Sequence, residues 1–210
     1  MEKTTFIYSL GFLFILMACD AGDYEQNPTN NLATSLVTAE QGKPVRTDLA
    51  FTAQQLAASY SNNFDDTDTT LSQKIVLLDS ASLYVPLFNS LKPVDFTLPT
   101  TTEAASFLTG HDDSYANLNV SLQMRSYLNV VLATDVVDYI TLLATINTDS
   151  SLTTTEKEQL QFIITYMNDT KGDPIEDDSW SKKNIVAAVH GFAKSSANAV
   201  FNVALVKVTH

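Results

Sequence analysis

Two aspartates, Asp135 and Asp138, lie within residues 119–146, the most apolar stretch of the chain after its first 18 residues. Being three residues apart, they would share one face of a helix. A pair of carboxylates in a dry setting can divide acid and base roles, because burial and mutual repulsion shift their pKa values apart. The sequence offers no obvious partner for such chemistry. The alternative is that one aspartate caps a helix that restarts after Ala133-Thr134.

A second candidate is the segment Ser179-Trp180-Ser181-Lys182. It resembles the S-x-x-K motif of penicillin-binding proteins and some β-lactamases, in which a serine nucleophile lies beside a lysine. The resemblance covers only four residues, because the sequence lacks the accompanying K-T-G and S-D-N motifs and is short for that fold. The sequence favours the plainer interpretation that Ser179 caps a helix, with Asp177 and Asp178 at its positive N-terminal end.

Candidate metal ligands are His111-Asp112-Asp113, in a predicted loop, and His190, in the last predicted helix. Imidazole and carboxylate groups together suit a transition metal. However, a paired spacing such as H-x-x-x-H or E-x-x-H is absent from the sequence. We therefore predict that His111 belongs to loop surface, that His190 lies at a helix interface, and that the protein binds no metal or other cofactor.

Two acidic runs, Asp65-Asp66-Thr67-Asp68 and residues 173–178, offer oxygen ligands for calcium. Neither fits the spacing of an EF-hand loop, so both are predicted to be solvated turns. Asp68-Thr69-Thr70 and Asp79-Ser80-Ala81 resemble the acceptor sequence for O-glycosylation in some Gram-negative exported proteins. The sequence leaves open whether Thr69 or Ser80 is modified.

The most specific signal lies at the N-terminus, where residues 6–17 (FIYSLGFLFILM) form an apolar run after Lys3. This length fits the core of a secretory signal peptide and is short for a membrane span, which needs about 20 apolar residues. The run ends at Leu16-Met17-Ala18-Cys19, which resembles the lipobox of bacterial lipoproteins. The resemblance implies that residues 1–18 are removed and that Cys19 carries palmitate-type acyl chains. It also implies a lipid-anchored protein of the cell envelope, either periplasmic or surface-exposed.

Cysteine content and charge constrain the mature chain. Cys19 is the only cysteine, so lipidation would leave no disulfide. The formal net charge is −12, and removing residues 1–18 deletes one acid and one base, which leaves it unchanged. Such an acidic chain argues against binding to nucleic acid and against docking on anionic lipid through protein charge. The predicted contact with the membrane is therefore the lipid on Cys19, while a protein or glycan partner remains unknown.

The apolar content of 45%, with only 6 glycines and 6 prolines, indicates a globular domain. Residues 19–45 are polar and interrupted by glycine and proline, so we interpret them as the lipidated N-terminus and a flexible tether. Hydrophobic spacing over residues 46–210 predicts an all-α domain, a single bundle of about five to seven helices.

Capping signals place several helix starts, namely Thr47-Asp48 and the capping boxes Thr100–Glu103 and Thr153–Glu156. Pro86 should break a helix spanning residues 71–91 near Tyr84. Residues 119–146 are expected to form one buried central helix, because they are apolar on most sides. Their charged residues argue against a membrane span.

A last helix is predicted from Ser179 or Ser181 to about Lys207, although residues 203–208 also resemble a strand. Small residues recur along it every fourth position, at Ala187, Gly191, Ser195 and Ala199. We expect this ridge to let the helix approach residues 119–146 closely. The alternative is an exposed seam for a partner or a second copy of the chain.

Two classes of function remain. The sequence favours a non-enzymatic binding or scaffold role for a lipid-anchored envelope protein, because no catalytic motif is complete. The alternative is a small hydrolase-like envelope enzyme with a carboxylate or histidine site. A pocket holding Asp135, Asp138 or His190 with a shifted pKa would favour the enzyme.

Overall fold

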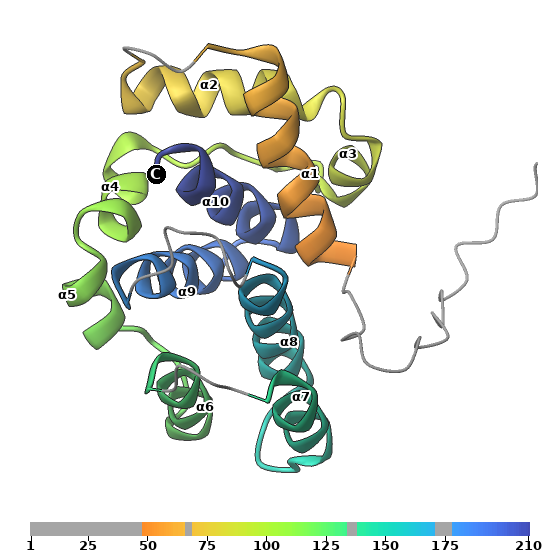
Figure 1. Cartoon of the computed structure of the whole chain (residues 1–210), viewed down its shortest axis with the longest axis vertical. Coiled ribbons are helices and arrows are strands. Elements are labelled where there is room, and N and C mark those ends of the chain that lie inside the picture. The colour runs from red at the N-terminus through yellow and green to blue at the C-terminus, as the bar shows by residue number, and fades with distance from the viewer. Residues whose placement is uncertain (1–47, 66–68, 134–137, 171–177) are drawn as a thin grey trace, which may run out of the picture. The chain divides into compact units, whose positions relative to one another are not determined.

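The computed structural model describes residues 48–65, 69–133, 138–170 and 178–210, all within one compact unit, Val37–His210 (Figure 1). These residues form ten helices and no strand, which confirms the all-α fold class. The helices are α1 (Asp48–Asn63), α2 (Leu71–Ser82), α3 (Pro86–Leu91), α4 (Thr101–Leu108), α5 (His111–Ala116), α6 (Leu122–Ala133), α7 (Tyr139–Thr148), α8 (Thr154–Asp169), α9 (Asp178–Phe192) and α10 (Ser196–Val208).

The predicted helix starts are confirmed. Thr100 and Thr153 cap α4 and α8, and in each case the side chain of the third helical residue returns a hydrogen bond to the cap, as a capping box requires. Helix α1 begins at Asp48. The break at Pro86 is also confirmed, since α2 ends at Ser82 and proline occupies the first position of α3.

The centre of the domain is a hairpin of α9 and α10, which make the most extensive helix–helix contact of the described residues. The prediction of one helix from Ser179 to Lys207 is therefore wrong. After Gly191 the chain turns, and the Ser195 hydroxyl accepts a hydrogen bond from the Asn198 amide to cap α10. Residues 203–208 are helical, so their resemblance to a strand reflects valine-rich burial and not strand pairing.

Gly191 explains why the two helices pack so closely. A Cβ atom at Gly191 would lie 2.3 Å from the Ala199 Cα, a separation far shorter than any van der Waals contact. The small-residue pattern therefore does mark a close helix approach, as predicted, but the approach is between α9 and α10. The expectation that it contacts residues 119–146 holds only for a minor contact between α6 and α9.

Helices α1, α2, α3 and α4 pack around α10, while α4, α5, α6 and α8 contact α9 (Figure 1). Between α3 and α10, the ring of Phe201 packs against Phe88 and Phe96 at centroid separations of 6.1 and 6.2 Å. Almost every residue of α10 is buried. The hairpin is thus held by apolar contacts on several sides.

The prediction of one central helix over residues 119–146 is wrong. The segment divides into α6 and α7, and Ile140 and Leu122 are 52% and 90% exposed. Helix α7 restarts at Asp138, whose carboxylate accepts a hydrogen bond from the Thr141 amide. This is the alternative that the sequence offered for the aspartate pair. No helix of the described residues is long and apolar enough to cross a membrane.

Candidate functional site

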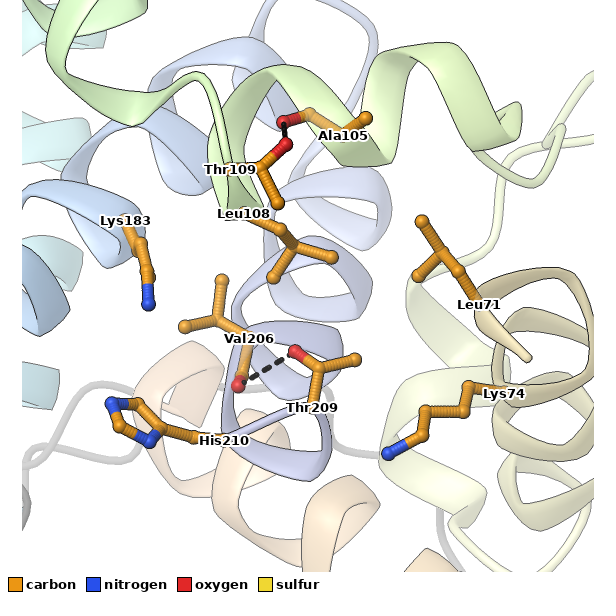
Figure 2. Close-up of a pocket in the computed structure, with 9 residues that line it drawn as sticks. All are labelled: Leu71, Lys74, Ala105, Leu108, Thr109, Lys183, Val206, Thr209 and His210. Carbon is orange, nitrogen blue, oxygen red and sulfur yellow. Dashed lines mark hydrogen bonds between the residues drawn. The ribbon is translucent and has the colours of Figure 1, made fainter. Parts of the chain in front are cut away.

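A pocket of about 320 Å³ opens between α2, α4, α9 and α10 (Figure 2). Helices α2 and α4 are distant in sequence from the α9–α10 hairpin, and they contribute because α10 contacts both of them and the end of α10 lines the pocket. The lining residues are Leu71 and Lys74 from α2, Ala105, Leu108 and Thr109 from the end of α4, Lys183 from α9, and Val206, Thr209 and His210 from the end of α10.

The middle of this pocket is apolar. The side chains of Leu71, Leu108 and Val206 come together there in Figure 2. The polar atoms of the two helix ends are turned to the backbone, since the Thr109 hydroxyl donates to the Ala105 carbonyl at 3.1 Å and the Thr209 hydroxyl donates to the Val206 carbonyl at 3.0 Å. The middle of the pocket can therefore accept an apolar group without breaking these hydrogen bonds.

The ionisable side chains that line the pocket are two lysines and a histidine. Lys74 donates from Nζ to the Val208 carbonyl at 3.1 Å, and Lys183 and His210 lie on other sides of the apolar middle (Figure 2). Within the described part of the chain, Lys183 forms no hydrogen bond or ion pair, and the pocket lining contains no aspartate or glutamate. This composition stands out in a chain with a net charge of −12.

His190 lines a second pocket, of about 250 Å³, between α4, α9 and α10. Burial lowers the pKa of His190, and the negative charge of Glu103 partly opposes this. Glu103 itself pairs with Lys194 at 2.6 Å, and the hydrogen bond from Lys194 lowers the pKa of the carboxyl. The prediction that His190 lies at a helix interface is consistent with this position. A pocket that holds His190 with a shifted pKa is also the feature that would favour an enzyme with a histidine site.

The prediction that His111 belongs to loop surface is wrong. It is the first residue of α5, its side chain is only 13% exposed, and its Nε2 lies 3.0 Å from the Ser179 hydroxyl. Lys182 pairs with Asp112 and Asp178, at 3.0 Å each, and these hydrogen bonds raise the pKa of Lys182. Ser179 is therefore placed beside a histidine, while the lysine of the S-x-x-K segment forms ion pairs with two aspartates.

The other sequence candidates have simpler positions. Asp138 is exposed at the start of α7, and hydrogen bonds with Thr141 lower the pKa of its carboxyl, which fits a helix cap. Ser80 lies within α2 and donates to the Val76 carbonyl, and Thr69 is half-buried just before that helix. Asp135, Cys19 and most of the two acidic runs lie outside the described residues. Among the residues that are described, no group of three or more His, Cys, Asp and Glu side chains gathers as a metal site would require.

Sequence reasoning missed the basic pocket because its residues have no common pattern. Lys74 and Lys183 are ordinary helix-surface residues by spacing, and only the packing of α2 and α9 around α10 brings them to one pocket. Comparisons with protein-family models, curated proteins and solved structures find no match for this chain.

Proposed function

We propose that this protein is a lipid-anchored lipoprotein of the cell envelope whose helical domain binds a small anionic amphiphile in the pocket between α2, α4, α9 and α10. The observation that carries this proposal is the basic character of the pocket in an otherwise acidic chain. A ligand with an apolar chain and a carboxylate would place the chain against Leu108 and Val206 and the carboxylate near Lys183.

The size of the pocket sets the size of the ligand. Ligand pockets span roughly 300–1,000 Å³, so a volume of about 320 Å³ suits a small molecule. Burying the apolar part of such a ligand contributes about 25 cal/mol for each Å² removed from water. The charged contact adds selectivity, because a partly buried ammonium group favours an anion over a neutral or cationic head group.

The anchor is proposed on the lipobox alone, since Cys19 lies outside the described residues. Two acyl chains hold a protein stably on a bilayer, whereas one gives only marginal binding. Cys19→Ser is expected to abolish labelling by a palmitate analogue and to leave the precursor uncleaved. Normal labelling of this variant would contradict the anchor, and it would leave the binding proposal standing.

The binding proposal is tested by calorimetric titration of the unlipidated mature chain, residues 20–210, with three eight-carbon probes. Octanoate should bind, whereas octan-1-ol and octylammonium, which differ only in the head group, should bind at least about tenfold more weakly, equivalent to about 1.4 kcal/mol. Equal binding of all three would contradict a charge-selective site. So would the absence of octanoate binding.

Variants assign the binding to the pocket. Lys183→Ala should weaken octanoate binding by about tenfold, because a hydrogen bond to a charged group contributes roughly 1.5 kcal/mol. Lys157→Ala removes the same charge from α8, where Lys157 donates to the Asn147 carbonyl and takes no part in the pocket. An equal loss in both variants would show that general charge, and not the pocket, controls binding.

A further inference from the structure

Ser179 and His111 come from segments 68 residues apart and meet where the N-terminal turns of α9 and α5 lie side by side. The Ser179 Oγ lies 3.0 Å from His111 Nε2. On the other side of the ring, His111 Nδ1 lies 3.3 Å from the Leu108 carbonyl oxygen. Thus the two nitrogens of the His111 ring contact a hydroxyl on one side and a backbone carbonyl on the other.

These partners favour one tautomer of the imidazole. A carbonyl oxygen can only accept a hydrogen bond, so the Leu108 carbonyl favours the neutral tautomer of His111 that carries its hydrogen on Nδ1, while Asp112 Oδ2 lies farther off, 3.8 Å from Nε2. Nε2 is then left with a lone pair directed at Ser179, and the serine hydroxyl is the donor. This is the arrangement of a nucleophile, a general base and a group that orients the base.

The surrounding ion pairs hold the two residues together. Lys182 lies between Asp112, the neighbour of His111, and Asp178, the neighbour of Ser179, and pairs with both at 3.0 Å. It therefore joins the start of α5 to the start of α9. Ser179 is half-buried and retains access to solvent, while most of the His111 side chain is covered.

We propose that Ser179 is a nucleophile toward carboxylic esters and that His111 is its general base. Ser179 Oγ attacks the ester carbonyl carbon while its proton moves to His111 Nε2. The tetrahedral intermediate expels the alcohol, which takes that proton, and an acyl-serine remains. Water then attacks the acyl-serine, gives a proton to His111 and releases the carboxylic acid, after which the proton returns to Ser179. No metal, redox reagent or further co-reactant is needed.

The basic pocket between α2, α4, α9 and α10 lies next to this pair, although the proposal does not depend on it. Leu108 lines the pocket, and its carbonyl orients His111. Lys183 lies one helical turn after Ser179 on α9, and residues four apart share a helix face. An ester with a short acyl chain is therefore the substrate class that both features would accommodate.

The test uses the full chain in detergent, treated with a fluorophosphonate probe and assayed with p-nitrophenyl butyrate. The native protein should acquire one phosphonyl group, which mass spectrometry of the peptides should locate on Ser179. Ester hydrolysis and labelling should both fall at least about a hundredfold in Ser179→Ala and His111→Gln, as expected for loss of a nucleophile or its base. Ser181→Ala, two residues along the same helix, should match the native protein.

The location of the label on the native protein makes the test independent of how the variants fold. An unlabelled native chain, or a label spread over several serines, would overturn the proposal. So would retention of hydrolysis in Ser179→Ala. Ser179→Ala separates this proposal from ligand binding, because Ser179 does not line the pocket and its loss should abolish labelling while leaving octanoate binding intact.

Discussion

The α9–α10 hairpin and the α6–α7 segment are both rich in apolar residues, yet they have very different environments. Almost all of α10 is buried, whereas α7 buries only Ile146 completely and exposes Ile140. The difference lies in what surrounds each helix. Helix α10 is packed by α1, α2, α3, α4 and α9, whereas α7 has its main contact with α8 alone.

This comparison shows that small residues at helical spacing are a better sign of a central helix than apolar content. Gly191 and Ala199 let two backbones approach closely, and other helices can then pack around the resulting hairpin. Apolar content alone does not ensure burial, because much of any folded surface is apolar. The pocket and the Ser179–His111 pair are both built on the hairpin, so their geometry depends on its rigidity.

The largest expected effect comes from adding one methyl group to the hairpin. Gly191→Ala should destabilise the domain by at least about 3 kcal/mol, because the new Cβ would overlap the α10 backbone and the helices would have to separate. Chemical denaturation measures this. Gly110→Ala is the control, since its Cβ would lie 3.4 Å from the nearest atom and should change stability by less than about 1 kcal/mol. Similar losses in both variants would contradict the close packing of α9 on α10.

Within α7, one isoleucine is buried and another is exposed, so the two can be compared directly. Ile146→Ala should cost about 2–5 kcal/mol, as for other buried large-to-small changes, because Ile146 is fully buried. Ile140→Ala should cost less than about 0.5 kcal/mol, because Ile140 is 52% exposed. Thermal unfolding of the two variants decides this. A large loss for Ile140→Ala would restore the prediction that this helix is central.

Helix α8 connects the two regions, since it contacts α6 and α7 on one side and α1 and α9 on the other. Thr153 caps it through a hydrogen bond from the Glu156 amide at 3.2 Å. Thr153→Ala should therefore destabilise the domain by about 1 kcal/mol, whereas Thr153→Ser should retain the cap. If the serine variant lost as much stability as the alanine variant, the cap hydrogen bond would not be the cause.

The smallest expected effect is on the pH dependence of stability, which should differ between the α9–α10 hairpin and the α6–α7 segment. Burial lowers the pKa of His190 on α9, so the unfolded chain binds the proton first as pH falls below about 6.5, and stability should decrease from there. His190→Asn should flatten the stability profile in this range. Asp138 on α7 has a lowered pKa, so its contribution is present above about pH 3.9 and is lost only on further acidification. Unfolding free energies measured from pH 7.5 to 4.5 should reveal the loss of stability that depends on His190, and not the loss that depends on Asp138.

Local signals predicted the parts of the fold that depend on neighbouring residues. The capping boxes at Thr100 and Thr153, the break at Pro86 and the restart at Asp138 each involve contacts within about four residues. The turn after Gly191 was missed, because the helical pattern continues through it and only the Ser195 cap marks the new start.

The candidate sites depend on contacts across long stretches of chain, which periodicity does not encode. His111 and Ser179 were each noticed as candidates, but nothing in their spacing shows that they meet. Lys74 and Lys183 carry no motif at all. Both sites arise only when α2, α4 and α5 pack around the hairpin.

The central claim is that the apolar surface which binds a ligand is the basic pocket on the hairpin and not the exposed surface of α6 and α7. Methyl NMR of residues 20–210 during titration with octanoate tests this most directly. The proposal predicts saturable shifts at Leu71, Leu108 and Val206, which line the pocket, and unchanged signals at Leu122 and Ile140. Shifts confined to Leu122 and Ile140, or shifts that fail to saturate, would contradict it.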